Sequence, residues 1–177
     1  MNEATCSPFL PDWFKTSALL YMRHEAIDPQ FFVRNRERLL ENLKPNSLVV
    51  IHANDIFPTN ADGTMAFRQN NDLFYLTGVD QEETVLILSP DAVLQEDRAI
   101  LFVRETSEQI AIWEGEKLTK EQATEASGMK NIQWVDAFEP AFRRLALQAE
   151  NIYLHTNEYV AASQIVETRN RRFIHRC

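Results

Sequence analysis

The chain alternates short continuous apolar runs with stretches in which apolar residues recur at helical spacing. A continuous run predicts a strand buried on both faces, because such a strand leaves no face for polar side chains. Runs of this kind occupy residues 47–52, 84–88, 99–103, 132–135 and 151–156. Strands and helices therefore alternate, which predicts an α/β fold with a mixed, mostly buried sheet flanked by helices.

The first predicted helix begins at Asp28-Pro29, which combines an N-cap acceptor with a proline at the first helical position. Its apolar residues recur on one face, while charged residues such as Arg34 and Glu41 fall on the other. The apolar residues are Phe32, Leu39, Leu40 and Leu43. Pro45 ends this helix, because proline cannot donate a helical hydrogen bond.

Three more helices are predicted toward the C-terminus. Thr119 and Gln122 form a capping box that opens a short helix, and Gly128 closes it. Further helices are expected to begin at Asp136 and at Asn157, whose side chains can accept hydrogen bonds from the free amides of a first turn.

Residues 67–79 read FRQNNDLFYLTGV and form the most distinctive stretch of the chain. Asn and Asp at positions 70–72 favour a turn, because their side chains bond nearby backbone groups. Residues 74–77 favour a short aromatic strand, and Gly78 permits the bend that ends it. With the apolar run at 84–88, this stretch predicts a β-hairpin joined by an acidic loop.

Composition narrows the classes of function. The 177 residues suit one domain, and the net charge of −8 disfavours nucleic acid and anionic membranes, which attract basic surfaces. Cys6 and Cys177 lie at opposite ends of the sequence, so no disulfide framework is expected. The sequence shows neither a secretory leader pattern nor an apolar run long enough to span a bilayer, which predicts a cytoplasmic protein.

Motifs for chemistry are scarce. The sequence contains no phosphate loop, no nucleophile elbow and no pair of histidines at metal-ligand spacing. The histidines are His24, His52, His155 and His175. His52 and His155 each follow an apolar strand, where a histidine can be catalytic if it lies in a cleft. A structural role is the commoner case, so neither is interpreted as a ligand.

Two charged clusters also have two interpretations each. Asp80, Glu82 and Glu83 could attract a cation, but they are interpreted as a solvated turn. The C-terminal arginines could form a basic patch, but they are interpreted as complementing a helix C-terminus. These arginines are Arg169, Arg171, Arg172 and Arg176.

The sequence FRQNNDLFYLTGVDQEETVLIL resembles the signature of the N-terminal domain in the aminopeptidase P branch of the creatinase/prolidase superfamily. The resemblance extends more loosely over residues 27–177 and implies the fold of that domain. Residues 1–26 are then an N-terminal extension or arm, and Met22 stands about where family members begin. This extension is either an ordinary packed arm or the product of an over-called start codon.

Full-length members of the family that the chain resembles are two-domain metallopeptidases that remove an N-terminal residue preceding proline. Their C-terminal pita-bread domain holds a dinuclear metal site, usually manganese, and none of its motifs occurs here. The resemblance implies a non-catalytic domain without a cofactor of its own, which shapes substrate access and subunit contacts in a homo-oligomer. The implied partners are its own C-terminal catalytic domain and short proline-containing peptides.

Two alternatives share this architecture. One is the N-terminal domain of a prolidase or creatinase-type hydrolase, and the other is a non-catalytic relative that binds peptides or histones. Sequence beyond residue 177 would separate an enzyme from a binder, because only an enzyme needs intact metal ligands there.

Asp72 is the main candidate site residue. Its carboxylate could cap the turn before the predicted strand, with Arg68 four residues earlier as an ionic partner. The resemblance implies a second role, in which this motif faces the cleft of the catalytic domain. There Asp72, Arg68 and Tyr75 would help to shape the substrate entrance. Tyr75 is otherwise expected to be a core or interface residue.

Overall fold

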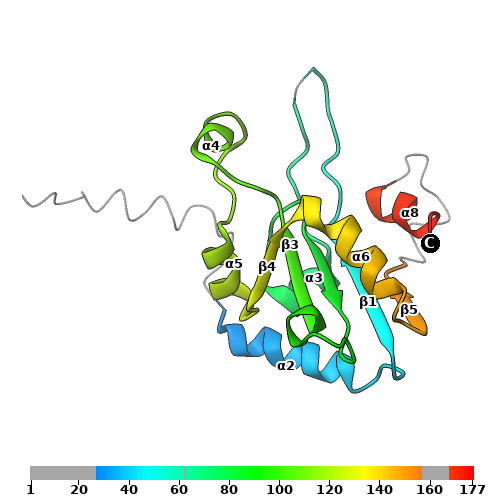
Figure 1. The fold of residues 1–177 in the computed structure, drawn as a ribbon. Helices are drawn as coiled ribbons and strands as arrows, with labels where there is room; N and C mark the ends of the chain where they lie inside the picture. Colours follow the sequence, from blue (N-terminus) through cyan, green and yellow to red (C-terminus); the bar gives the residue numbers. More distant parts are fainter. Residues whose placement is uncertain (1–26, 62, 157–167) are drawn as a thin grey trace, which may run out of the picture.

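The computed structural model describes residues 27–61, 63–156 and 168–177. Five strands form one mixed sheet in the order β4-β3-β2-β1-β5 (Figure 1). The pairs β1–β2 and β2–β3 are antiparallel, whereas β1–β5 and β3–β4 are parallel. The strands are β1 (Ser47–His52), β2 (Val85–Leu88), β3 (Ala99–Val103), β4 (Asn131–Trp134) and β5 (Asn151–Leu154).

Helices cover both faces of this sheet, so the predicted α/β fold is confirmed. The first face carries α2 (Pro29–Leu40), α3 (Asn71–Thr77) and α5 (Lys120–Ser127). The second face carries α6 (Phe138–Ala146) and α8 (Arg169–Ile174). The short 3₁₀ helix η2 (Val135–Ala137) leads into α6 and packs against the same cluster. The other described helices are α4 (Glu108–Glu114) and the 3₁₀ helix η1 (Gln95–Arg98).

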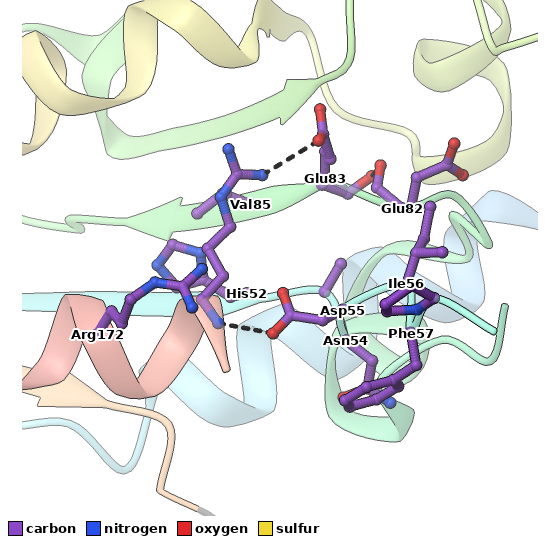
Figure 2. A pocket seen from close by; sticks show the side chains of 13 residues that line it. His52, Asn54, Asp55, Ile56, Phe57, Glu82, Glu83, Val85 and Arg172 are labelled. Carbon is purple, nitrogen blue, oxygen red and sulfur yellow. Dashed lines mark hydrogen bonds and ion pairs between the residues drawn. The ribbon is translucent and has the colours of Figure 1, made fainter. Parts of the chain in front are cut away.

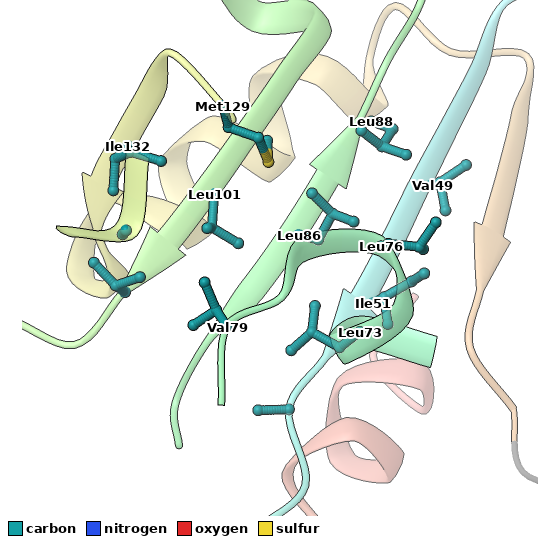
Figure 3. Close-up of a cluster of buried hydrophobic side chains, with 13 residues drawn as sticks. Val49, Ile51, Leu73, Leu76, Val79, Leu86, Leu88, Leu101, Met129 and Ile132 are labelled. Carbon is teal, nitrogen blue, oxygen red and sulfur yellow. The ribbon is translucent and has the colours of Figure 1, made fainter. Parts of the chain in front are cut away.

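The hydrophobic core consists of two clusters, one on each face of the sheet. In β2, Leu86 and Leu88 pack into the cluster beneath α2, α3 and α5, part of which Figure 3 shows. Val85 and Ile87 pack into the cluster beneath α6 and α8. All four side chains are at most 2% exposed. The continuous apolar run in the sequence therefore reflects a strand without a solvent face.

The predicted helix ends are largely confirmed. Asp28 Oδ1 accepts a hydrogen bond of 2.9 Å from Gln30 N at the start of α2. The capping box of α5 is present, because Thr119 N donates to Gln122 Oε1 at 2.8 Å and Gln122 N donates to Thr119 Oγ1 at 3.2 Å. Gly128 ends α5 in the left-handed conformation, with φ of 67°.

Some predictions differ from the structure or lie outside it. Asp136 does not cap a helix, since it lies inside η2, and α6 begins at Phe138 without a side-chain cap. The helix α4 was not predicted from the sequence. The helix predicted from Asn157 and the arm at residues 1–26 lie outside the described residues.

The prediction of a strand at residues 74–77 is wrong, because α3 occupies this stretch. Asn70 Oδ1 accepts hydrogen bonds from Asp72 N at 2.9 Å and from Leu73 N at 3.1 Å, which caps the first turn. Leu73, Leu76 and Thr77 are then buried at helical spacing. The cap and this burial outweigh the strand propensity of the aromatic residues, which is a weak preference.

Gly78 ends α3 in a left-handed conformation, with φ of 69°. A Cβ added there would overlap the ring of Phe32. This residue of α2 is 2% exposed, and its ring packs against α3. The backbone angle and the close approach of the ring therefore both require glycine.

We expect Gly78→Ala to destabilise the domain by about 3 kcal/mol, since it adds overpacking to an unfavourable φ. Gly128→Ala is the matched control, because Gly128 also ends a helix in the left-handed conformation, with φ of 67°, but no atom lies closer than 3.1 Å to its added Cβ. It should cost only about 1 kcal/mol. Urea unfolding followed by circular dichroism measures both, and equal losses would contradict a packing role for Gly78.

Candidate functional site

The side chain of Asp72 lies at the N-terminal end of α3 and reaches the end of β5. Its Oδ2 lies 2.6 Å from His155 Nε2, and the Asp72 side chain is 65% exposed. Arg68 is not its partner among the described residues; the Arg68 carbonyl instead accepts from Asn54 Nδ2 at 3.0 Å. The pair joins residues that are 83 positions apart, so sequence spacing gave no signal for it.

Tyr75 lies on the surface of α3 and is 46% exposed. Its ring meets Phe31 of α2 edge to face, with 6.0 Å between the centroids. Phe31 is 41% exposed and Ile27 nearby in sequence is 40% exposed. Tyr75 is therefore a surface residue beside other exposed apolar side chains.

Two adjoining pockets lie where β1 ends, and both are lined by residues 52–57. The second also reaches the end of β5. The first, of about 400 Å³, extends toward the acidic loop and α8 (Figure 2). The second, of about 500 Å³, extends between α8 and the loop at residues 53–70, and is called the α8 groove below. Arg68 and His155 line the α8 groove, whereas Asp72 reaches it only through His155.

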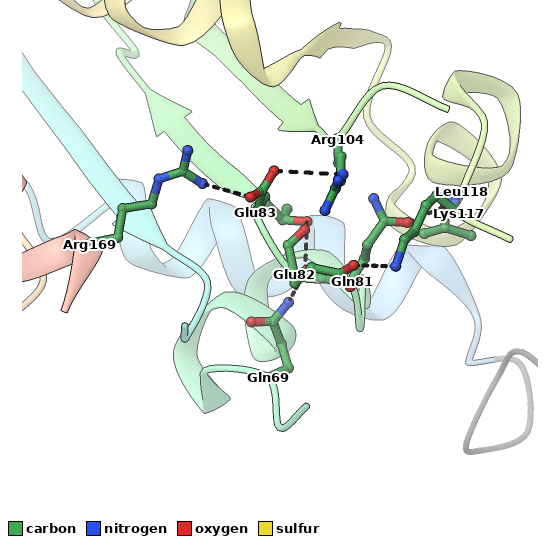
Figure 4. Close-up of polar contacts among 9 residues, drawn as sticks. Gln69, Gln81, Glu82, Glu83, Arg104, Lys117, Leu118 and Arg169 are labelled. Carbon is green, nitrogen blue, oxygen red and sulfur yellow. Dashed lines mark hydrogen bonds and ion pairs between the residues drawn. The ribbon is translucent and has the colours of Figure 1, made fainter. Parts of the chain in front are cut away.

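The acidic loop after α3 is held by polar contacts (Figure 4). Gln81 is fully buried, and its Oε1 accepts from Leu118 N at 2.7 Å. Gln69 Nε2 donates to the carbonyls of Val79 and Gln81 at 3.0 and 2.9 Å. The Gln81 bond fixes the loop against the segment that precedes α5, and the Gln69 bonds fix it against the residues before α3.

The interpretation of this loop as a solvated turn is wrong for Glu82. Its side chain is 8% exposed and forms an ion pair with Lys117, whose side chain is 11% exposed. Glu83 is more exposed and lies 3.9 Å from Arg104 and 3.8 Å from Arg169. The carboxylates thus contact basic side chains from α8, from the residue after β3 and from the segment before α5, and they do not form an open cation site.

His52 is a buried polar side chain that lines both pockets. It is 4% exposed, and its ring lies 4.8 Å from Phe173 and 5.2 Å from Phe138, centroid to centroid. Neither ring nitrogen has a hydrogen-bond partner among the described residues. Burial, with smaller contributions from the positive charges of Arg169 and Arg176, lowers the pKa of His52 to about 4. The ring is therefore neutral near pH 7.

No group of three or more His, Cys, Asp or Glu residues that could hold a metal occurs among the described residues. His52 and His155 line the α8 groove but do not form such a group. In the described part of the chain, no helix has the length and apolar character needed to cross a membrane.

These features define a three-layer α/β domain with a groove at the ends of two parallel strands. Residues 32–153 match the family described as "Aminopeptidase P, N-terminal domain". The chain therefore belongs to the aminopeptidase P N-terminal domain family. This confirms the resemblance that the sequence FRQNNDLFYLTG indicated.

The curated relatives include a Xaa-Pro aminopeptidase of Escherichia coli, which is 30% identical over 144 residues. This match covers 80% of the chain and 32% of that protein. Xaa-Pro aminopeptidase 3 of Dictyostelium discoideum is 32% identical over 119 residues, which are 66% of the chain and 23% of that protein. The chain thus spans a third or less of the length of these relatives.

Solved structures show the same fold. An Escherichia coli aminopeptidase P variant superposes with a TM-score of 0.66 at 29% identity, covering 78% of this chain and 31% of that one. Pseudomonas aeruginosa aminopeptidase PepP gives a TM-score of 0.69 at 22% identity, covering 86% of this chain and 32% of that one. The second likeness concerns the fold alone.

We expect His52 to make the domain sensitive to acid. The pKa of His52 in the folded domain is about 4, below the ordinary value of 6.5. Between these two pH values the unfolded chain binds a proton that the folded domain does not bind. The free energy of unfolding is therefore highest above pH 6.5 and falls as the pH is lowered toward 4. The full loss is about 3 kcal/mol.

His52→Phe should remove this part of the pH dependence, because phenylalanine fills the aromatic site without a group that titrates. The test compares urea unfolding of both proteins between pH 7.5 and 4. The difference in unfolding free energy should change across this range, and a constant difference would contradict the assignment.

We expect Lys117→Met to destabilise the domain by about 3 kcal/mol, because it leaves the Glu82 carboxylate buried without its cation. Adding Glu82→Gln should restore part of this loss. The matched control is Arg143→Met, which removes an exposed pair with Glu139 at 3.8 Å and should cost less than about 1 kcal/mol. Similar unfolding midpoints for the two single variants would contradict a buried ion pair.

Proposed function

We propose that this chain is the non-catalytic N-terminal domain of a metal-dependent Xaa-Pro aminopeptidase, in which it walls the path of peptides to a C-terminal catalytic domain. The observation that carries the proposal is the family match over residues 32–153, together with relatives that are Xaa-Pro aminopeptidases and of whose length the match covers a third or less. The described residues offer no set of metal ligands, so the proposal assigns the dinuclear metal, with manganese expected, to the catalytic domain.

The exposed surface of α3 supports a wall function. Tyr75 and Phe31 form an exposed edge-to-face aromatic pair, and Asp72 stands in the same helix as Tyr75, in its first turn. An aromatic surface of this kind is suited to contact another domain, a second subunit or a peptide. A wall contributes to rate by positioning, since a small displacement of a substrate costs orders of magnitude.

The side chains of Asp72 and His155 would keep this wall in place. Their contact joins α3 to the end of β5 and so connects helix and sheet at the edge of the groove. Arg68 lines that groove and would present its positive charge to a peptide entering along it. In this proposal the domain also contributes to contacts in a homo-oligomer and acts in the cytoplasm.

The test compares the 177-residue chain with a longer protein that includes the catalytic domain. With added Mn²⁺, we expect the longer protein to hydrolyse a Xaa-Pro tripeptide and the chain alone to show no hydrolysis. A chelator should abolish the activity of the longer protein. Chelator-sensitive hydrolysis by the purified chain, or an inactive longer protein, would overturn the proposal.

In the longer protein, Tyr75→Ala should lower kcat/KM for peptides by about tenfold, as expected when a positioning contact is removed. Leu147→Ala is the control, because Leu147 is 89% exposed and follows α6 on the other face of the sheet. Its kcat/KM should equal that of the unaltered protein. Equal values for both variants would exclude a wall function for Tyr75.

A further inference from the structure

The inward face of α2 carries two polar side chains among its apolar ones. Phe32, Asn35 and Arg36 are the buried residues of this helix, and their spacing places them on one face. Asn35 is 3% exposed and Arg36 is 7% exposed. Leu39 and Leu40 of the same helix pack against the core cluster. Burial of an amide and a guanidinium is unusual, so these two side chains need partners inside the domain.

Both polar side chains donate hydrogen bonds to the end of α3. Asn35 Nδ2 donates to the Tyr75 carbonyl at 2.8 Å, and Arg36 Nη1 donates to the Leu76 carbonyl at 2.6 Å. The last carbonyls of a helix lack donors within the helix itself. Side chains of α2 therefore supply the hydrogen bonds that α3 cannot form alone.

Arg36 also contacts the end of α5. Its Nη2 donates to the Ser127 carbonyl at 2.9 Å. Burial lowers the pKa of Arg36 to about 10, so the guanidinium remains charged near pH 7. This charge lies at the C-terminal ends of two helices, where a cation is stabilising. One side chain of α2 thus fixes α3 and α5 relative to each other.

The hydrogen bonds restrict α3 more than its apolar contacts do. The ring of Phe32 meets Phe74 edge to face, with 6.1 Å between the centroids. Burial of apolar surface is non-directional, so this packing alone would tolerate a small rotation of α3. A hydrogen bond weakens steeply when its donor and acceptor are misaligned. The bonds from Asn35 and Arg36 therefore set the rotation of the last turn of α3.

Tyr75 is the exposed residue whose placement depends on that rotation. Its carbonyl accepts the bond from Asn35, and its ring, on a residue that is 46% exposed, meets Phe31 edge to face. Both contacts come from α2, one to the backbone and one to the side chain. The buried face of α2 is thus connected to the exposed aromatic surface of α3.

We propose that Asn35 and Arg36 are positioning residues for Tyr75. Both are buried, so they would not contact a peptide themselves and would act through the Tyr75 ring. This inference rests on the proposed function, because the placement of Tyr75 affects activity only if α3 walls the path of peptides.

The first test follows the ring of Tyr75 in the 177-residue chain by NMR, with Tyr75→Phe to assign its signals. The ring of Phe31 should displace these signals from the values of free tyrosine. Asn35→Ala should move them toward those values, because a directional bond is lost. Arg36→Lys should do the same, since an ammonium cannot replace the planar fork of a guanidinium. Signals that stay in place in both variants would overturn the proposal.

Asn42→Ala is the matched control. Asn42 Nδ2 also donates to a backbone carbonyl, that of Arg38 at 2.7 Å, but this bond is exposed and lies at the end of α2. The control should leave the Tyr75 signals unchanged, and a shift as large as that of Asn35→Ala would contradict the assignment. The unfolding midpoint identifies the variants that are folded. Arg36→Lys, which keeps the charge, decides the test if Asn35→Ala does not fold.

The second test measures kcat/KM of the longer protein for a Xaa-Pro tripeptide. Asn35→Ala should lower it about fivefold, the factor expected for the loss of one hydrogen bond. In a Tyr75→Ala background the same change should have no further effect, because the residue through which Asn35 acts is absent. Equal losses in both backgrounds would indicate a general structural role and overturn the proposal.

The two tests separate this inference from the proposed function. An inactive longer protein would overturn the proposed function, while the ring signals would still show whether Asn35 and Arg36 place Tyr75. Unchanged ring signals together with an active longer protein would overturn the inference alone.

Discussion

The burial of the central strands on both faces is the constraint on which the rest of this structure depends. Side chains of β2 that are at most 2% exposed point into both clusters, so each face of the sheet must be covered. The helices α2, α3 and α5 cover the first face. The second face is covered by α6 and by α8, whose Phe173 belongs to the core cluster there. The need to bury Phe173 brings α8 beside the ends of β1 and β5, and the groove is a consequence of this docking.

The parallel pairing of β1 with β5 determines what the groove contains. Val50 lies opposite Leu154 in the register, so His52 and His155 follow at the same end of the sheet. The carboxyl ends of parallel strands are where α/β folds commonly place ligands, because the loops that follow them diverge there. The two histidines nevertheless differ: His52 is enclosed by Phe138 and Phe173, while His155 contacts a carboxylate.

The parts of the fold that depend on local pattern could be predicted from the sequence. The apolar runs predicted the strands, and the caps at Asp28 and Thr119 predicted two helix starts, because each signal acts within a few residues. The helix α3 was missed because its cap, Asn70, also favours a turn and the aromatic residues that follow favour a strand. The partners of Asp72 and Glu82 were missed because they lie 83 and 35 positions away, and only the sheet brings them together.

The buried ring of His52 is an unfavourable feature of the domain, because neither ring nitrogen has a hydrogen-bond partner among the described residues. A phenylalanine at position 52 would extend the aromatic cluster of Phe138, Phe142 and Phe173 without burying ring nitrogens. His52 is thus a polar residue in an otherwise apolar cluster. In proteins generally, residues that do not suit their packing environment commonly lie at functional sites. Glu82 differs, because its burial is matched by Lys117 within the domain. Among the described residues, the buried Glu82 carboxylate is therefore matched by a cation, whereas the ring nitrogens of His52 have no hydrogen-bond partner.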